Sequence, residues 1–331
     1  MDALLVAVVV TALVFDYTNG FHDAANAVAT SISTRAVPPS VALVAAAILN
    51  VLGALVSTEV AATVAGGIVE PASVTPAVML GGLVGAIAWN LATWWWALPS
   101  SSSHCLIGGM VGAVMAKAGL EPVLWGGILA KVIVPTVMAP LIGFSVGIAL
   151  MLVLLWLFRN AHPGPLVRRF RVAQLVSASF MAFSHGSNDA QKTMGVITLA
   201  LFSGGVIPHL DVPLWVKLAS AITIGLGTWA GGKRIIRTLG MRLVKLSPVH
   251  GFAAETSASA VLLSTAALGL PVSTTHVITT SIMGVGATER ASAVKWGMTR
   301  DIFLAWILTF PASALIGALC TLVTLRLFGA E

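Results

Sequence analysis

The chain has 331 residues, of which 57% are hydrophobic and 9% charged, and its mean hydropathy is +0.97. Soluble globular domains carry roughly 25% charged residues, so this composition excludes a soluble protein and indicates an integral membrane protein. The formal net charge of +6 comes from basic residues in the loops between apolar segments, which is typical of membrane topology and not of a nucleic-acid-binding surface.

Five apolar segments in each half are candidate membrane helices, because a spanning helix needs about 20 mostly apolar residues. We expect them near residues 3–34, 38–64, 76–98, 100–118, 122–158, 172–207, 212–232, 248–269, 271–288 and 301–326. The first lacks a basic leader and a cleavage site, so we expect a retained helix and no signal peptide. We predict breaks in 3–34 and 172–207 and an interruption at Pro135, with some segments forming two pieces or re-entrant hairpins.

A polar, basic linker over residues 159–171 divides the chain into a first half, 1–158, and a second half, 172–331. Most of the other basic loops fall on the same side of the membrane as this linker if each half crosses five times. Since basic loops favour the cytoplasm, we predict a cytoplasmic linker and external N- and C-termini, in a multi-pass protein of the cell (plasma or inner) membrane.

Two motifs recur in the same order in both halves. Gly20–Asp23 aligns with Gly186–Asp189, and Leu98–Ala113 aligns with Leu270–Ala287. An odd number of spans in each half requires the two repeats to insert with opposite orientations. The sequence therefore predicts an all-α integral membrane protein of two inverted repeats with broken or re-entrant helices, an architecture of secondary transporters.

The first repeated motif places a carboxylate, Asp23 or Asp189, within an apolar segment of each half. A carboxylate inside a membrane is costly and commonly marks an ion or substrate pathway. The neighbouring glycines would allow an unwound backbone at each site. Helix capping is the alternative interpretation of both aspartates. A ligand role is favoured by the duplication and by further polar residues nearby: Asn26, Asn188, Gln191 and Lys192.

The second repeated motif is a proline followed by a run of hydroxyl residues, Ser100–Ser103 or Ser273–Thr275. A helix that begins here would direct its free amide groups and hydroxyls towards an anion. Ordinary N-capping is the alternative. An anion beside two carboxylates requires a cation or a proton, so the pattern predicts anion–cation symport. A protonated oxyanion could donate a hydrogen bond to a carboxylate, which favours phosphate over sulfate.

Other chemistries are less consistent with the sequence. The histidines lack the short spacing of a transition-metal site, so the only metal that we expect is an alkali ion at Asp23, Asn26 or Asp189. Glu255 is a candidate proton carrier or supporting residue. A duplicated half-site is a feature of transporters, so we expect neither an enzyme nor a bound cofactor. A sulfate permease and a passive anion channel remain alternatives.

The repeated motifs "GFHDAAN" and "GSNDAQK", together with "LPSSSSHCLIGG", "LPVSTTH" and "GFAAETSAS", resemble the inorganic phosphate transporter (PiT) family. The resemblance implies symport of inorganic phosphate with Na⁺ or H⁺ by an inverted-repeat, homodimeric protein in the lipid bilayer. It also implies phosphate binding by Ser102, Ser103, Ser273, Thr274, Thr275, Asn188 and Lys192. Cation or proton coupling is assigned to Asp23, Asn26, Asp189 and Glu255.

The chain departs from the family's signature at His22, where the family has Asn, and at Gln191 and Lys192, which replace Ala and Asn. The cation sites of the two halves therefore need not be equivalent. Lys192 could offset a carboxylate or contact phosphate.

Overall fold

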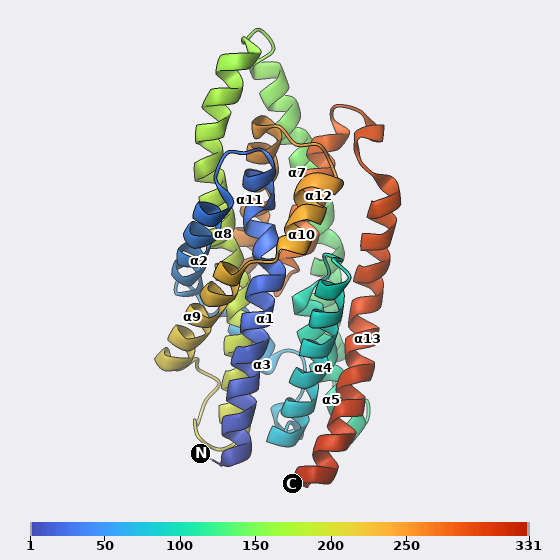
Figure 1. Cartoon of the computed structure of the whole chain (residues 1–331). Helices are drawn as coiled ribbons and strands as arrows, with labels where there is room; N and C mark the ends of the chain where they lie inside the picture. The colour runs from blue at the N-terminus through green and yellow to red at the C-terminus, as the bar shows by residue number, and fades with distance from the viewer. Residues whose placement is uncertain (1, 330–331) are drawn as a thin grey trace.

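The computed structural model describes residues 2–329, and this part of the chain is almost entirely helical, with no β-strand (Figure 1). Met1 and residues 330–331, the outermost residues of the two predicted halves, lie outside the described part. The α-helices are α1 (Ala3–Ser33), α2 (Pro39–Ala54), α3 (Glu59–Gly66), α4 (Pro76–Trp95), α5 (Ser102–Ala118), α6 (Trp125–Ile128), α7 (Val134–Leu157), α8 (Pro163–Ser203), α9 (Leu214–Ala230), α10 (Lys233–Arg237), α11 (Pro248–Ala267), α12 (Thr274–Ala287) and α13 (Trp296–Phe328).

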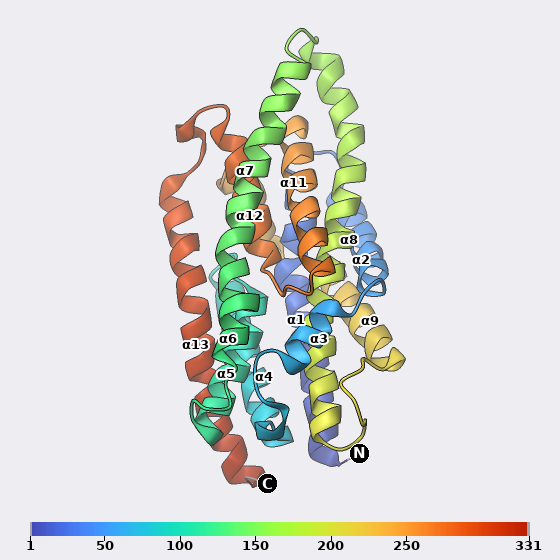
Figure 2. The ribbon, with the colours of Figure 1, turned by 180° about the vertical axis from the view of Figure 1, so that it is seen from behind.

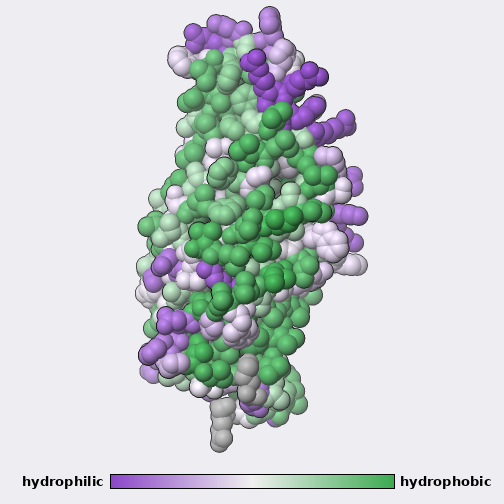
Figure 3. Space-filling model, turned by 90° about the vertical axis from the view of Figure 1, so that its left-hand side faces the viewer, coloured by the Kyte–Doolittle hydropathy of each residue, from purple (hydrophilic) through white to green (hydrophobic). Residues whose placement is uncertain are grey.

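The two chain termini lie at one end of the molecule, and the linker between α7 and α8 lies at the other (Figures 1 and 2). Each half therefore carries the chain from one end to the other, in opposite directions. Hydrophobic residues cover much of the side face in Figure 3, while hydrophilic residues gather at the linker end. Large apolar side chains such as Trp156, Ile307 and Leu214 are mostly exposed, as a lipid-facing protein requires.

Four helices are long and apolar enough to cross a membrane individually: α1, α4, α13 and the continuous stretch Trp125–Leu157. The pair α2 and α3, bent by 70°, adds a fifth candidate. The predicted spans 76–98 and 100–118 form a hairpin, α4–α5, within the terminal half of the molecule, and 248–269 and 271–288 form another, α11–α12, within the linker half (Figures 1 and 2). These four or five candidate spans are fewer than the ten segments predicted, and re-entry of the two hairpins remains a prediction.

The predicted breaks in the first and eighth helices are wrong, because α1 and α8 are continuous helices of 31 and 41 residues. Their glycines serve close packing and not unwinding. A Cβ atom on Gly20 would lie 2.5 Å from the carbonyl oxygen of Ile224 in α9, and one on Gly186 would lie 2.1 Å from that of Asn50 in α2. The aligned glycines therefore allow two equivalent helix contacts, α1 with α9 and α8 with α2.

The predicted interruption at Pro135 is a change of helix type and not a break. A π-helical turn, Leu129–Ile133, joins α6 to α7 just before this proline, which occupies the first turn of α7. Such turns commonly accommodate a local change in the backbone hydrogen bonding of a long helix. Proline also lies inside α7 and α13, at Pro140 and Pro311, which are 311 − 140 = 171 residues apart. This separation and the paired helix contacts are consistent with inverted repeats.

Candidate functional site

The duplicated motifs meet in the interior, where α1 and α8 pack together and the N-termini of α5 and α12 approach them. The two hairpins enter from opposite ends of the molecule, so their turns bring both hydroxyl runs to the same depth as Asp23 and Asp189 (Figures 1 and 2). Both aspartates are buried. The sequence-predicted motifs of the two halves thus form one continuous polar site.

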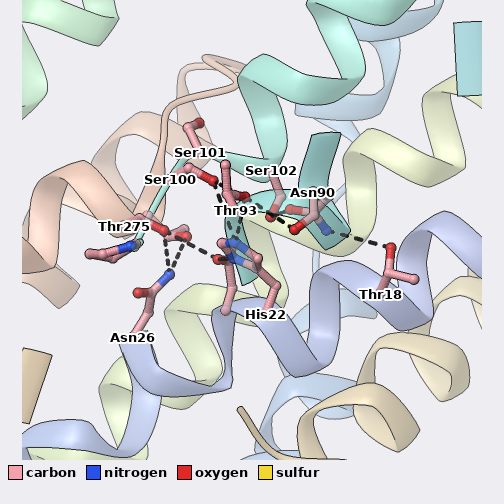
Figure 4. A network of polar contacts seen from close by, with 12 residues as sticks. Thr18, His22, Asn26, Asn90, Thr93, Ser100, Ser101, Ser102 and Thr275 are labelled. Atoms are coloured by element: carbon pink, nitrogen blue, oxygen red, sulfur yellow. Dashed lines mark hydrogen bonds and ion pairs between the residues drawn. The ribbon is translucent and has the colours of Figure 1, made fainter. Parts of the chain in front are cut away.

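The first half-site is centred on Asp23 of α1. One carboxylate oxygen lies 2.8 Å from Nδ1 of His22 and accepts a hydrogen bond of 3.2 Å from the hydroxyl of Thr275. The amide nitrogen of Asn26 donates to the hydroxyls of Thr274 and Thr275, at 3.2 and 2.9 Å (Figure 4 shows Asn26 and Thr275). The amide oxygen of Asn26 is buried and has no hydrogen-bond partner in the described chain, so it can accept one or bind a cation.

The second half-site is centred on Asp189 of α8. Its carboxylate forms an ion pair with Lys192, and its other oxygen lies 3.0 Å from Nε2 of His185 and accepts a hydrogen bond of 2.9 Å from Thr274. The ammonium of Lys192 also donates to the hydroxyl of Ser103 at 2.5 Å and to the carbonyl of Val272 at 2.8 Å. A lysine that is only 1% exposed is thus fully paired with protein groups.

The two half-sites are close enough to act together. Oxygen or nitrogen atoms of Asp23, His185 and Asp189 lie within 4.8 Å of one another. The adjacent hydroxyls of Thr274 and Thr275 contact one aspartate each, so the N-terminus of α12 joins the two carboxylates. Hard oxygen ligands of this kind suit an alkali ion, while hydroxyls and a helix N-terminus suit an oxyanion.

The predicted hydroxyl residues have different environments. Ser101 and Ser273 cap α5 and α12 by accepting hydrogen bonds from the backbone amides of His104 and His276, at 3.2 and 3.3 Å. The capping alternative is therefore correct for these two serines. Ser102 donates to Asn90 at 3.0 Å, away from the carboxylates (Figure 4). Ser103, Thr274 and Thr275 are the predicted hydroxyls that adjoin the aspartates and Lys192.

Two predicted residues of α8 also differ in their surroundings. The amide nitrogen of Asn188 donates to the carbonyl of Leu270 at 3.4 Å, while its buried oxygen has no partner in the described chain. The side chain of Gln191 accepts a hydrogen bond of 2.9 Å from the backbone amide of Val60 at the start of α3. Asn188 thus has a free acceptor next to the site, while Gln191 fixes the end of a neighbouring helix.

Glu255 lies in a separate cluster. Its carboxylate accepts hydrogen bonds from Thr30 and Ser177 at 2.5 Å each and from Gln174 at 3.1 Å. This cluster joins α11 to α1 and α8. No described hydrogen bond connects Glu255 to either aspartate, so the sequence prediction that grouped the three acidic residues is not supported by direct contact.

Asp16 is a buried carboxylate that was absent from the predicted site residues. It accepts a hydrogen bond of 2.9 Å from Thr193 of α8, and its second oxygen has no partner in the described chain. The spacing of Asp16, Asp23 and Thr30 carries a detectable signal, because seven residues are about two helical turns, or roughly 10 Å. All three therefore lie on the face of α1 that contacts α8 or α11.

Comparison with known proteins agrees with this geometry. The profile of the "Phosphate transporter family" matches residues 19–317. A protein of Rhizobium meliloti described as "Probable low-affinity inorganic phosphate transporter" is 48% identical over 319 residues, which cover 96% of this chain and 95% of that protein. A protein of Bacillus subtilis with the same description is 41% identical over 334 residues, 99% of this chain and 100% of the relative.

A solved structure titled "The sodium-dependent phosphate transporter" has the same fold, with a TM-score of 0.90 and 25% sequence identity. The match covers 99% of this chain and 100% of the solved one. The expectations of a helical, multi-pass membrane transport protein, and not an enzyme, are therefore confirmed by its relatives. A family match over most of the chain, together with two relatives of nearly full coverage, shows that this protein belongs to the phosphate transporter family.

Proposed function

We propose that this protein imports inorganic phosphate by symport with a cation, Na⁺ or H⁺, through alternating access. The observation that carries the proposal is the buried meeting of Asp23 and Asp189 at the hydroxyl-bearing N-termini of α5 and α12. Lys192 offsets the charge of Asp189, but the carboxylate of Asp23 still repels an anion in a low-dielectric interior unless positive charge accompanies it. Binding of phosphate there is therefore coupled to binding of a cation or a proton.

We assign phosphate binding to Thr274 and Thr275, whose hydroxyls contact the two carboxylates, and to Ser103, whose hydroxyl contacts Lys192. The free amide oxygen of Asn188 would accept a hydrogen bond from a protonated phosphate oxygen. Ser102 would need to exchange the hydrogen bond that it donates to Asn90, and Ser273 caps α12 through its oxygen, so we give both serines a supporting part in this proposal.

We assign cation coupling to the first half-site, where the carboxylate of Asp23 and the free amide oxygen of Asn26 are hard ligands. The name of the solved relative, a sodium-dependent transporter, supports Na⁺ as the ion to test first. Glu255 belongs to the proposal as a proton-carrying group apart from the phosphate, since it lies buried between α11, α1 and α8. The cytoplasmic linker, the external termini and a homodimer remain predictions.

The deciding experiment is uptake of radiolabelled phosphate into proteoliposomes with a sodium gradient and a proton gradient imposed separately. We expect phosphate to accumulate above equilibrium under one of the two gradients. Accumulation driven by protons alone would assign the coupling to a protonated carboxyl group, and Glu255→Gln in the same assay would test that residue. Uptake that never exceeds equilibrium would indicate a passive channel. Accumulation of sulfate in place of phosphate would indicate a sulfate permease.

A further inference from the structure

The two half-sites align residue by residue, and one of the differences between them lies three residues after each aspartate. Asn26 follows Asp23 by three residues, and Lys192 follows Asp189 by three residues. Asn26 contacts the hydroxyl of Thr275, and Lys192 contacts that of Ser103, which is the aligned residue of the other hairpin, 275 − 103 = 172 residues apart. Asn26 and Lys192 therefore each contact a hydroxyl at the helix N-terminus of the other half's hairpin, while both aspartates accept hydrogen bonds from hydroxyls of α12.

The side chains three residues after each aspartate differ in their chemistry: one can bind a cation, and the other is a cation. Asn26 presents a buried amide oxygen with no partner in the described chain, next to the carboxylate of Asp23. Lys192 presents an ammonium whose three N–H groups meet the carboxylate of Asp189, the hydroxyl of Ser103 and the carbonyl of Val272. The first half offers an oxygen for a cation, and the second already contains a cation.

The ligands of this ammonium are those that an alkali ion would select. A carboxylate, a hydroxyl and a backbone carbonyl are hard oxygen donors, and all three come from different parts of the second half-site or its partner hairpin. A compact ammonium is a point charge with little directional preference, so it can replace a bound monovalent ion among such oxygens.

We propose that Lys192 is a tethered cation that permanently fills the cation position of the second half-site. This inference rests on the proposed function, because it concerns the number of ions that accompany phosphate. A charge attached to α8 neutralises Asp189 but is not itself transported. The chain therefore binds one coupling cation fewer than a chain with asparagine at both positions, and its ion coupling comes from the first half-site.

The test is equilibrium binding of radioactive sodium to the purified full-length protein in detergent, counted per chain. Lys192→Asn would give the second half the same carboxylate–amide pair as Asp23 and Asn26, so we expect it to bind one more sodium ion per chain than the wild type. Lys192→Met also vacates the position but supplies no oxygen of its own, so we expect it to gain an ion that binds more weakly than in Lys192→Asn. The swap Asn26→Lys/Lys192→Asn moves the tethered charge to the first half, so it should bind as many sodium ions as the wild type.

Transport gives a second measurement. We expect the sodium dependence of phosphate uptake by Lys192→Asn to become steeper than that of the wild type. Sodium binding by Lys192→Asn equal to that of the wild type would overturn the proposal. If Lys192→Asn alone proves unstable, sodium binding by the swapped variant that differs from the wild type would do the same. Failure of the wild type to accumulate phosphate under any gradient would instead contradict the proposed function, whatever the sodium count.

Discussion

Polar side chains are rare in this chain, and their partners decide what each can do. The aspartates and the hydroxyl runs could be identified from sequence because each occurs twice in an apolar context. The sequence could not show which of these hydroxyls contact the aspartates or Lys192 and which have other partners. Ser102 and Ser103 are neighbours, yet one contacts Asn90 and the other Lys192, because successive residues at a helix N-terminus point in directions about 100° apart.

The partners of the charged side chains could not be identified from sequence either. The sequence left open whether Lys192 offsets a carboxylate or contacts phosphate, and the ion pair with Asp189 shows the first interaction directly. Asp16 was not assigned to the site, because its partner, Thr193, lies on a helix far away in sequence. Such a contact depends on how α1 and α8 pack, which a single sequence does not contain.

The two aspartates should respond differently to neutralisation. We expect Asp189→Asn to lower the thermal stability in detergent more than Asp23→Asn, because it leaves the buried ammonium of Lys192 unpaired. Removing one partner of a buried ion pair costs about 3–5 kcal/mol, whereas loss of ordinary buried hydrogen bonds at Asp23 costs about 1–3 kcal/mol. Both variants should lose concentrative phosphate uptake. Equal stability of the two proteins would contradict the pairing of Asp189 with Lys192, and wild-type accumulation by Asp23→Asn would contradict the coupling role of Asp23.

At the scale of the elements, the sequence predicted the positions of the helices more accurately than their continuity and packing. Glycines within 3–34 and 172–207 were interpreted as sites of unwinding, but α1 and α8 continue through them. A glycine permits both an irregular backbone and the close approach of a second helix. The choice between these uses depends on the neighbouring helix, which is α9 for Gly20 and α2 for Gly186.

This packing makes a prediction that two glycines of the same helix can test. Gly186→Ala should greatly reduce the yield of folded, monodisperse protein, because its Cβ would lie 2.1 Å from a backbone oxygen and 2.6 Å from the Cα of Asn50. Gly164→Ala is the matched control, since a Cβ there has no heavy atom within 4 Å. Alanine favours a helix over glycine by up to about 1 kcal/mol, so the control should be neutral or slightly stabilising. Normal folding of Gly186→Ala would show that α2 and α8 can separate without loss.

At the scale of the whole molecule, the repeats explain why the termini lie at one end and the linker at the other. Four or five helices are long and apolar enough to cross a membrane, fewer than the ten segments predicted, because hydropathy alone does not distinguish a full span from an arm of a hairpin. Reclassifying one pair of spans in each half as a hairpin removes an even number of crossings. The opposite orientation of the two halves is therefore unaffected, and the termini and the linker lie at opposite ends (Figure 1).

Because the N-terminus and the linker lie at opposite ends, the predicted membrane orientation can be tested with one label at each end. In a variant without its native cysteines, Cys105→Ala/Cys320→Ala, a single cysteine replaces either Asp2 or His162, both exposed and at opposite ends. Because basic loops remain in the cytoplasm, we expect a membrane-impermeant maleimide to label Asp2→Cys on intact cells but His162→Cys only after permeabilisation. The reverse pattern would place the basic linker outside and contradict the orientation. It would leave the inverted arrangement of the halves intact, because that depends only on the two sites lying on opposite sides.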